Sequence, residues 1–288
     1  MDIDLHAGLA GIELAEPQFD LGGGVVLRRT YAHMFAPFML AFTPAEAGKP
    51  TPGPWKAARG GLTFDITAEL HIPGVLDERY KSRLDVARAI VFLLRLGVNP
   101  SATLPVYSYT PFSALPIAKD DNLVLEPLEV EPRRFPLAVD DGVVSQAAAD
   151  WVKERWVKTL KLRREHAEFA LAVDALDQGQ FVSRSELTLV SIWAALEALF
   201  SPTTSELRFR VSALIASYLE PAGELRVARQ KAISKLYDKR SAAAHGKPTH
   251  EAQHLLDSFN LLREVLTRML DVGYVPTKEQ LENGLFGA

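Results

Sequence analysis

The chain has 288 residues, of which 48% are hydrophobic and 24% are charged, and its formal net charge is −4. This composition is typical of a globular protein with room for two domains, and it excludes a disordered or fibrous chain. The absence of cysteine excludes disulfides, thiolate metal sites and cysteine nucleophiles, and it fits the cytoplasmic location that we expect. No apolar run approaches the roughly 18 residues of a membrane span, so we expect no membrane partner.

The first 140 residues predict a mixed α/β domain. Hydrophobic side chains alternate with polar ones in residues 61–72, as expected for a half-buried strand. Residues 82–96 instead have helical periodicity, and Gly97 and Pro100 follow as stop signals. Further extended segments are expected at residues 21–29, 102–110 and 123–130.

The rest of the chain is expected to be almost entirely helical. The proline-containing residues 131–141 are the predicted linker, and short connections between the helices that follow favour antiparallel neighbours. The predicted helices cover residues 145–176, 185–200, 205–219, 223–244 and 249–272. We therefore predict an α+β protein, with a mixed α/β domain of unknown sensor or regulatory role over residues 1–140 and an all-α helical bundle over residues 141–288.

The most informative segment is the end of a predicted helix, where Arg240 precedes His245 by five positions and Gly246 follows. Arginine is a permanent planar cation that binds phosphate with two hydrogen bonds, and histidine titrates near neutral pH. The pair therefore indicates phosphodiester chemistry without a metal. Arg28 and His33 have the same spacing, but they lie in a segment that reads as a strand, and we interpret that copy as coincidence.

Basic residues gather around this motif. Residues 226–247 include seven basic side chains and one acidic side chain, although the whole chain is acidic. A local excess of positive charge attracts nucleic-acid phosphates, and the alternative is a solvated helix face. The residues that we expect to contact RNA are Arg226, Arg229, Lys235, Lys239 and Lys247.

Two further residues of the helical part are candidates for supporting roles. Glu197 lies in an otherwise apolar helix, and a buried carboxylate requires a partner, for which Arg240 is the candidate. This pair would orient the guanidinium, whereas an exposed Glu197 would have no such role. Tyr237, one turn before Arg240, either stacks on a base or packs within the bundle, and we favour packing.

Together these features resemble the HEPN domains, and among them the Apea-like branch of bacterial defence and toxin proteins. The resemblance rests on the Arg-x4-His-Gly motif at Arg240, on the Leu-Tyr-x-x-Arg-Ser segment that ends at Ser241, and on the helix Ile-Trp-Ala-Ala-Leu-Glu-Ala-Leu-Phe of residues 192–200. It covers the C-terminal half of the chain. Many HEPN domains have Asn, Asp or His directly after the arginine, so Ser241 would be a weaker polar helper.

The resemblance implies a metal-independent RNA endonuclease of a defence or toxin system, which works as a homodimer through its helical half. Arg240 would stabilise charge on the phosphorane and His245 would move the proton, without a cofactor. RNA is then the expected partner, because DNA lacks the 2'-hydroxyl. An antitoxin or phage-derived trigger would fit such a system but is not specified. The alternative is a catalytically inactive HEPN-like module for dimerisation or RNA binding.

A zinc peptidase motif competes with this interpretation. Residues 250–254 read His-Glu-Ala-Gln-His and match the His-Glu-x-x-His pattern. Two histidines one turn apart on a helix can share a zinc ion, but the site needs a third ligand. Pro248 and Thr249 place His250 in the first helical turn, and no Gly-x-x-His continuation follows. We therefore predict no metal site.

Overall fold

The computed structural model describes residues 3–75, 82–119, 124–131, 142–200, 207–244 and 252–286. Contacts between residues divide the chain into two compact units. The first unit comprises Met1–Arg79, Ala102–Val130 and Gly142–Ala149. The second unit comprises Tyr80–Ser101, Glu131–Asp141 and Asp150–Ala288. Each unit is therefore assembled from segments that are separated in the sequence.

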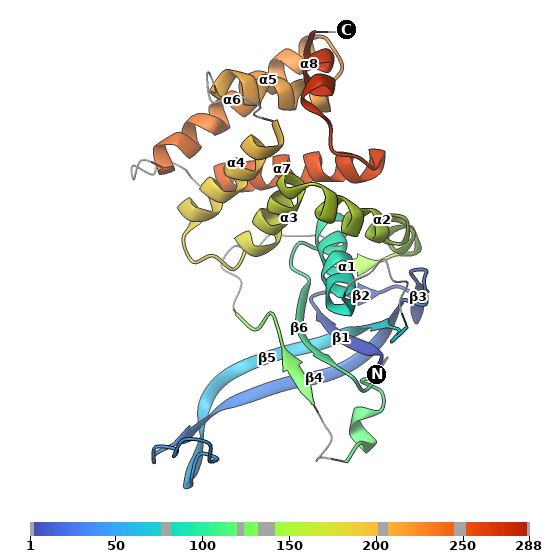
Figure 1. Cartoon of the computed structure of the whole chain (residues 1–288), viewed down its shortest axis with the longest axis vertical. Coiled ribbons are helices and arrows are strands. Elements are labelled where there is room, and N and C mark those ends of the chain that lie inside the picture. The colour runs from blue at the N-terminus through green and yellow to red at the C-terminus, as the bar shows by residue number, and fades with distance from the viewer. Residues whose placement is uncertain are drawn as a thin grey trace. The chain divides into compact units, whose positions relative to one another are not determined.

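The first unit is built on a six-stranded sheet (Figure 1). Its strands are β1 (Leu5–Ala10), β3 (Gln18–Asp20), β4 (Val26–Ala41), β5 (Trp55–Ile72), β6 (Thr103–Ser108) and β7 (Leu125–Pro127). They lie in the order β3-β4-β5-β1-β6-β7, and all neighbours are antiparallel. A separate parallel pair joins β2 (Glu13–Leu14) to β8 (Val143–Val144). A short 3-10 helix, η1 (Leu115–Ile117), follows β6.

The two faces of the central strand pair differ in chemistry. Because side chains alternate along a strand, Leu5, Ala7 and Leu9 of β1 share one face with Ala68, Leu70 and Ile72 of β5. The buried apolar side chains are Leu5, Ala7, Leu9, Ala68, Leu70 and Ile72. The opposite face has His6 on β1 and Glu69 and His71 on β5. β1 was not predicted, because all six of its residues are buried and a strand buried on both faces shows little alternation of polarity.

Strands β4 and β5 form a long two-stranded ribbon that continues past the other strands (Figure 1). They have 16 and 18 residues, so both exceed the strands expected at residues 21–29 and 61–72. Several large apolar side chains of the ribbon are exposed, among them Tyr31, Phe35, Met39 and Trp55. Away from the sheet a ribbon has no layer to cover it, which explains this exposure.

The second unit is helical. Its helices are α1 (Arg83–Gly97), α2 (Gln146–Glu165, from Asp150 onward), α3 (Ala167–Gly179), α4 (Ser185–Phe200), α5 (Leu207–Leu219), α6 (Glu224–Ala244), α7 (Ala252–Val272) and α8 (Lys278–Phe286). The helix predicted over residues 145–176 is two helices, since His166 has extended backbone angles of φ −130° and ψ 105°. Helix α8 was not predicted.

Helix α1 belongs to this helical unit, although the sequence placed it within the N-terminal 140 residues. Its Arg95 forms a buried ion pair with Asp177 of α3, with 2.5 Å between Nη1 and Oδ1. The Nε of Arg263 on α7 donates a hydrogen bond of 2.6 Å to the carbonyl of Leu96. These contacts join helices that are far apart in the sequence.

The α+β class is confirmed, with an N-terminal sheet and mostly C-terminal helices. Within the described ranges, no helix combines the length and the apolar character that crossing a membrane requires. Residues 132–141, which make up most of the predicted linker, lie outside the described residues.

Candidate functional site

Helix α6 positions the basic motif that the sequence singled out. It is described from Glu224 to Ala244, and Arg240 lies in the last turns of this span. His245 and Lys247 lie outside the described residues. The structure therefore describes the arginine of the motif and its surroundings.

Arg240 is held by a carboxylate from the neighbouring helix α4. Its Nη2 lies 3.0 Å from Oε2 of Glu197, and the side chains are 21% and 19% exposed. The other carboxylate oxygen accepts a hydrogen bond of 2.8 Å from the hydroxyl of Tyr237. The expected pairing of Glu197 with Arg240 is thus present. The arginine Nε is buried and has no hydrogen-bond partner among the described residues.

Aromatic packing fixes the geometry of this cluster. The guanidinium carbon of Arg240 lies 5.4 Å from the centre of the Tyr237 ring. That ring packs edge-to-face on Trp193, with 5.3 Å between centroids, and the Trp193 indole donates to Ser258. Tyr237 is buried, as the packing interpretation expects. A fixed guanidinium loses little conformational freedom when it binds an anion.

The electrostatics of the cluster limit what Arg240 can do. Burial, together with the hydrogen bond to Glu197, raises the pKa of Tyr237 to about 12, so its hydroxyl remains a donor at physiological pH. Glu197 therefore accepts from both neighbours and offsets the charge of Arg240. Any anion would be bound through directed N–H groups rather than through a net positive charge. Ser241 follows Arg240 in the same helical turn and is half-buried.

The expected RNA-contacting residues are not all available to a ligand. Arg226 donates to the carbonyls of Glu220 and Gly284, at 3.0 and 3.1 Å. Arg229 forms an ion pair with Glu264 of α7. Lys235 is exposed on α6, and Lys239 is half-buried. Two of the five cations therefore connect parts of the helical unit.

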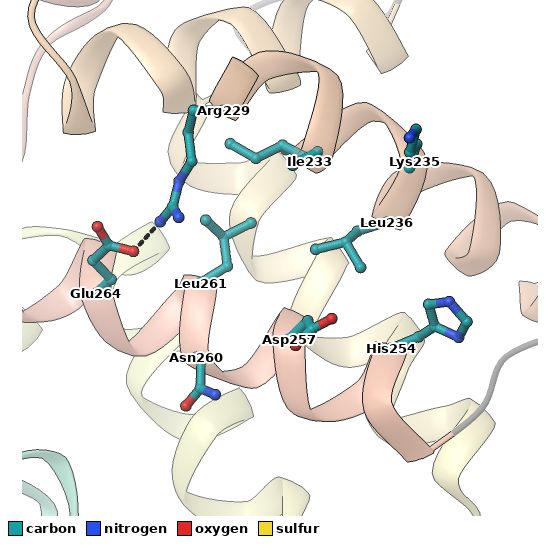
Figure 2. A pocket seen from close by; sticks show the side chains of 10 residues that line it. Arg229, Ile233, Lys235, Leu236, His254, Asp257, Asn260, Leu261 and Glu264 are labelled. Carbon is teal, nitrogen blue, oxygen red and sulfur yellow. Dashed lines mark hydrogen bonds and ion pairs between the residues drawn. The ribbon is translucent and has the colours of Figure 1, made fainter. Parts of the chain in front are cut away.

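Sequence reasoning missed a pocket of about 420 Å³ between α6 and α7. Figure 2 shows Arg229 reaching towards Glu264 at one end, with Lys235 and His254 at the other. Asp257 also lines the pocket, so basic and acidic groups are mixed. Mixed charge disfavours a polyanion and suits a small polar ligand. Its α7 residues recur at three- and four-residue intervals, a spacing that could have revealed a shared helix face.

The His-Glu-x-x-His motif is only partly described. Helix α7 begins at Ala252, His254 lines the pocket, and His250 and Glu251 lie outside the described residues. Among the residues that are described, the group of side chains able to hold a metal ion is Asp4, His6 and His71 of the first unit.

Comparisons of the chain with protein-family models, with curated proteins and with solved structures found no match.

Proposed function

We propose that this protein is a metal-independent RNA endonuclease that uses Arg240 and His245. The observation that supports the proposal is the fixed guanidinium of Arg240, held by Glu197 in the last described turns of α6, five positions before His245 in the sequence. The HEPN-like motif in the sequence points to the same two residues. A defence or toxin role and a cytoplasmic location are part of the proposal.

In the proposed reaction, the 2'-hydroxyl of a ribose loses its proton and attacks the adjacent phosphorus. The bond from phosphorus to the 5'-oxygen breaks, and the products are a 2',3'-cyclic phosphate and a 5'-hydroxyl. His245 accepts the first proton or donates the proton that the leaving oxygen needs. Arg240 donates hydrogen bonds to the phosphorane oxygens. A homodimer through the helical unit would bring two such motifs to one RNA strand.

A catalytically inactive RNA-binding or dimerisation module is the second candidate. It is favoured by the engagement of Arg240 with Glu197, of Arg226 with two carbonyls and of Arg229 with Glu264. In such a module these arginines would serve packing, and His245 would have no chemical role.

Cleavage of a labelled RNA pool by the purified protein in EDTA tests the proposal. We expect wild type to cut and to leave cyclic phosphate ends. His245→Ala should lower the rate by about 10²- to 10⁴-fold, because general acid–base catalysis is lost. Arg240→Lys should also be strongly impaired while keeping the charge opposite Glu197. Arg208→Ala, which removes an exposed arginine paired with Asp238, is the matched control and should cut normally.

Arg240→Ala would leave Glu197 without its ion-pair partner, so its fold must be checked by circular dichroism. RNA that stays intact with the wild-type protein, or that is cut equally by the His245→Ala protein, would contradict the nuclease. Binding of intact RNA by both proteins would support the module instead.

A further inference from the structure

The central strand pair of the first unit repeats one short pattern. β1 is preceded by Asp4 and includes His6, so the segment reads acid-Leu-His, and Glu69, Leu70 and His71 of β5 repeat it. In the antiparallel register His6 lies directly opposite His71. The carboxylate of each strand is therefore a diagonal neighbour of the histidine on the other strand. Two histidines and two carboxylates meet on the polar face of the sheet.

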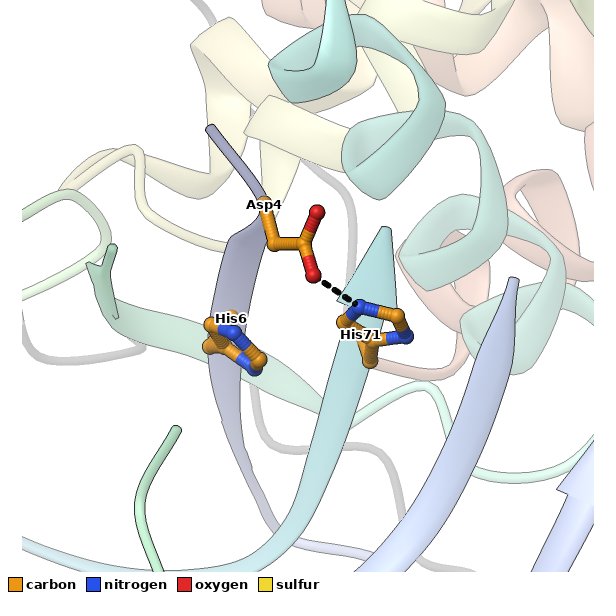
Figure 3. A group of neighbouring side chains, drawn as sticks. All are labelled: Asp4, His6 and His71. Carbon is orange, nitrogen blue, oxygen red and sulfur yellow. Dashed lines mark hydrogen bonds and ion pairs between the residues drawn. The ribbon is translucent and has the colours of Figure 1, made fainter. Parts of the chain in front are cut away.

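The carboxylates hydrogen-bond across the strand pair. Nδ1 of His6 lies 2.8 Å from Oε1 of Glu69, and Nε2 of His71 lies 2.9 Å from Oδ2 of Asp4. The two imidazole rings are stacked, with 5.0 Å between their centroids. Figure 3 shows the His6 ring beside His71, with Asp4 above both.

Glu69 orients His6 from the buried side. It is 1% exposed, and its other oxygen accepts a hydrogen bond of 2.8 Å from the backbone N–H of Phe112. Burial alone would raise the pKa of Glu69, but the hydrogen bonds from His6 and Phe112 outweigh it and hold the pKa below its ordinary value. An ionised carboxylate only accepts, so Nδ1 of His6 bears the proton. Nε2 is then the ring nitrogen of His6 that does not face Glu69. A carboxylate behind a histidine in this way is typical of metal sites.

Asp4 closes the cluster from the solvent side. Its Oδ1 accepts a hydrogen bond of 2.8 Å from the backbone N–H of Gly74, and its side chain is 49% exposed. Both oxygens of Asp4 therefore accept hydrogen bonds, one from Gly74 and one from His71. The side chain of His71 beside it is 18% exposed, whereas His6 is buried.

We propose that Asp4, His6 and His71 bind a zinc ion. One nitrogen or oxygen of each residue lies within 4.8 Å of the others. Zinc bonds of about 2.0–2.1 Å in tetrahedral geometry require separations of about 3.3 Å, so the side chains rotate to bring the three ligand atoms together. At Nε2 of His71 the ion replaces the proton shared with Asp4, and that proton moves to Nδ1, which has no hydrogen-bond partner among the described residues. Two imidazoles and one carboxylate leave a fourth position for water.

The proposed nuclease chemistry needs no metal, so the zinc site is separate from it. The charges of the side chains around the site support zinc binding. Asp4 and Glu69 contribute two negative charges, and Arg28, whose Nε lies 3.6 Å from Glu69, offsets one of them. Two carboxylates against one guanidinium give the site an excess of acidic groups, which attracts a divalent cation. His33 and Asp65, on the same sheet, form a hydrogen bond of similar geometry. Among the described residues, this pair is not part of a group of three side chains that could hold a metal ion. It is therefore a matched negative control.

Zinc titration by calorimetry, on protein freed of any affinity tag, tests the site. Wild type and His33→Gln should bind one equivalent with equal affinity. His71→Gln and Asp4→Asn, which change partly exposed groups, should lose this binding. Glu69→Gln should weaken it by about 10- to 100-fold, because it removes the partner that orients His6. Since His254 belongs to the alternative zinc motif, the His254→Gln protein should bind as wild type does.

Cobalt provides a second measurement on wild type alone, so it does not depend on the folding of a variant. Co²⁺ should give the intense visible spectrum of a four-coordinate site, and Zn²⁺ should abolish it by displacement. A weak six-coordinate spectrum, no saturable zinc binding, or undiminished binding by His71→Gln would each overturn the proposal. RNA cleavage is measured separately, so its failure leaves these outcomes unchanged.

Discussion

Glu197 shows how one carboxylate organises a polar cluster inside a helical unit. It accepts from Tyr237 on one oxygen and from Arg240 on the other, and it is about four fifths buried. Removing either donor leaves a desolvated acceptor without a replacement, which costs more than the average hydrogen bond. The cluster is therefore sensitive to single-atom changes.

Tyr237→Phe deletes one hydroxyl and should lower the free energy of unfolding by about 1.5–3 kcal/mol, the usual worth of a hydrogen bond to a charged group. The control is Tyr218→Phe, because the Tyr218 hydroxyl is buried without a hydrogen-bond partner among the described residues. Its removal should leave stability unchanged or slightly increased. Urea unfolding followed by far-ultraviolet circular dichroism measures both, and equal losses would contradict this account.

The partner of a single residue could be predicted where the residue's own sequence neighbours implied that it needs one. A carboxylate in an apolar helix needs a partner, and this argument led from Glu197 to Arg240 without a structure. The engagement of Arg226 and Arg229 could not be predicted in this way. Their acceptors are the carbonyls of Glu220 and Gly284 and the carboxylate of Glu264, and only the tertiary arrangement brings them near.

At the scale of elements, helices were easier to predict than strands. The segment expected at residues 185–200 coincides with α4, and that at residues 223–244 differs from α6 by one residue. Their starts and stops are marked by local residues. β1 has no such signal, because both of its faces are buried. The His6–His71 group was missed with it, although the repeated acid-Leu-His pattern was visible in the sequence.

Gly8 explains how β1 fits at the centre of the sheet. A Cβ atom at this position would lie 2.7 Å from Cζ of Phe112 and 3.0 Å from Cδ1 of Ile66. Gly8→Ala should therefore destabilise the first unit by about 1–3 kcal/mol through overpacking. It should also weaken zinc binding, since Phe112 donates the hydrogen bond that holds Glu69. Thermal unfolding and zinc titration of the variant measure the two effects.

Gly284→Ala is the control for this substitution. An added Cβ there meets nothing within 4 Å, and the residue lies in helix α8, where alanine is favoured over glycine. Stability should stay the same or rise by up to about 1 kcal/mol. A Gly8→Ala protein as stable as this control would show that Phe112 gives way without cost.

At the scale of the whole chain, the two units are interleaved in the sequence. Helix α1 lies between β5 and β6 of the first unit but belongs to the second. The sequence showed the helix and its ends, and it could not show which unit the helix joins. That assignment depends on contacts such as Arg95 with Asp177, which are 82 residues apart.

A fragment of residues 142–288 should therefore be less stable than the helical unit of the intact chain. Without α1, Asp177 loses the arginine that neutralises it in a buried position, and the carbonyl contact of Arg263 is lost. An unpaired buried charge alone costs about 3–5 kcal/mol. We expect a lower unfolding midpoint and aggregation, measured by circular dichroism and size-exclusion chromatography.

Co-expression of the fragment with residues 80–101 should restore stability, because α1 supplies nine buried apolar residues as well as Arg95. The same segment with Arg95→Ala keeps the apolar residues and lacks the cation, so it should restore less. Full stability of residues 142–288 alone would show that α1 is dispensable. Activity assays on the helical part should in any case include α1, since a fragment that has lost it cannot distinguish an inactive site from an incomplete fold.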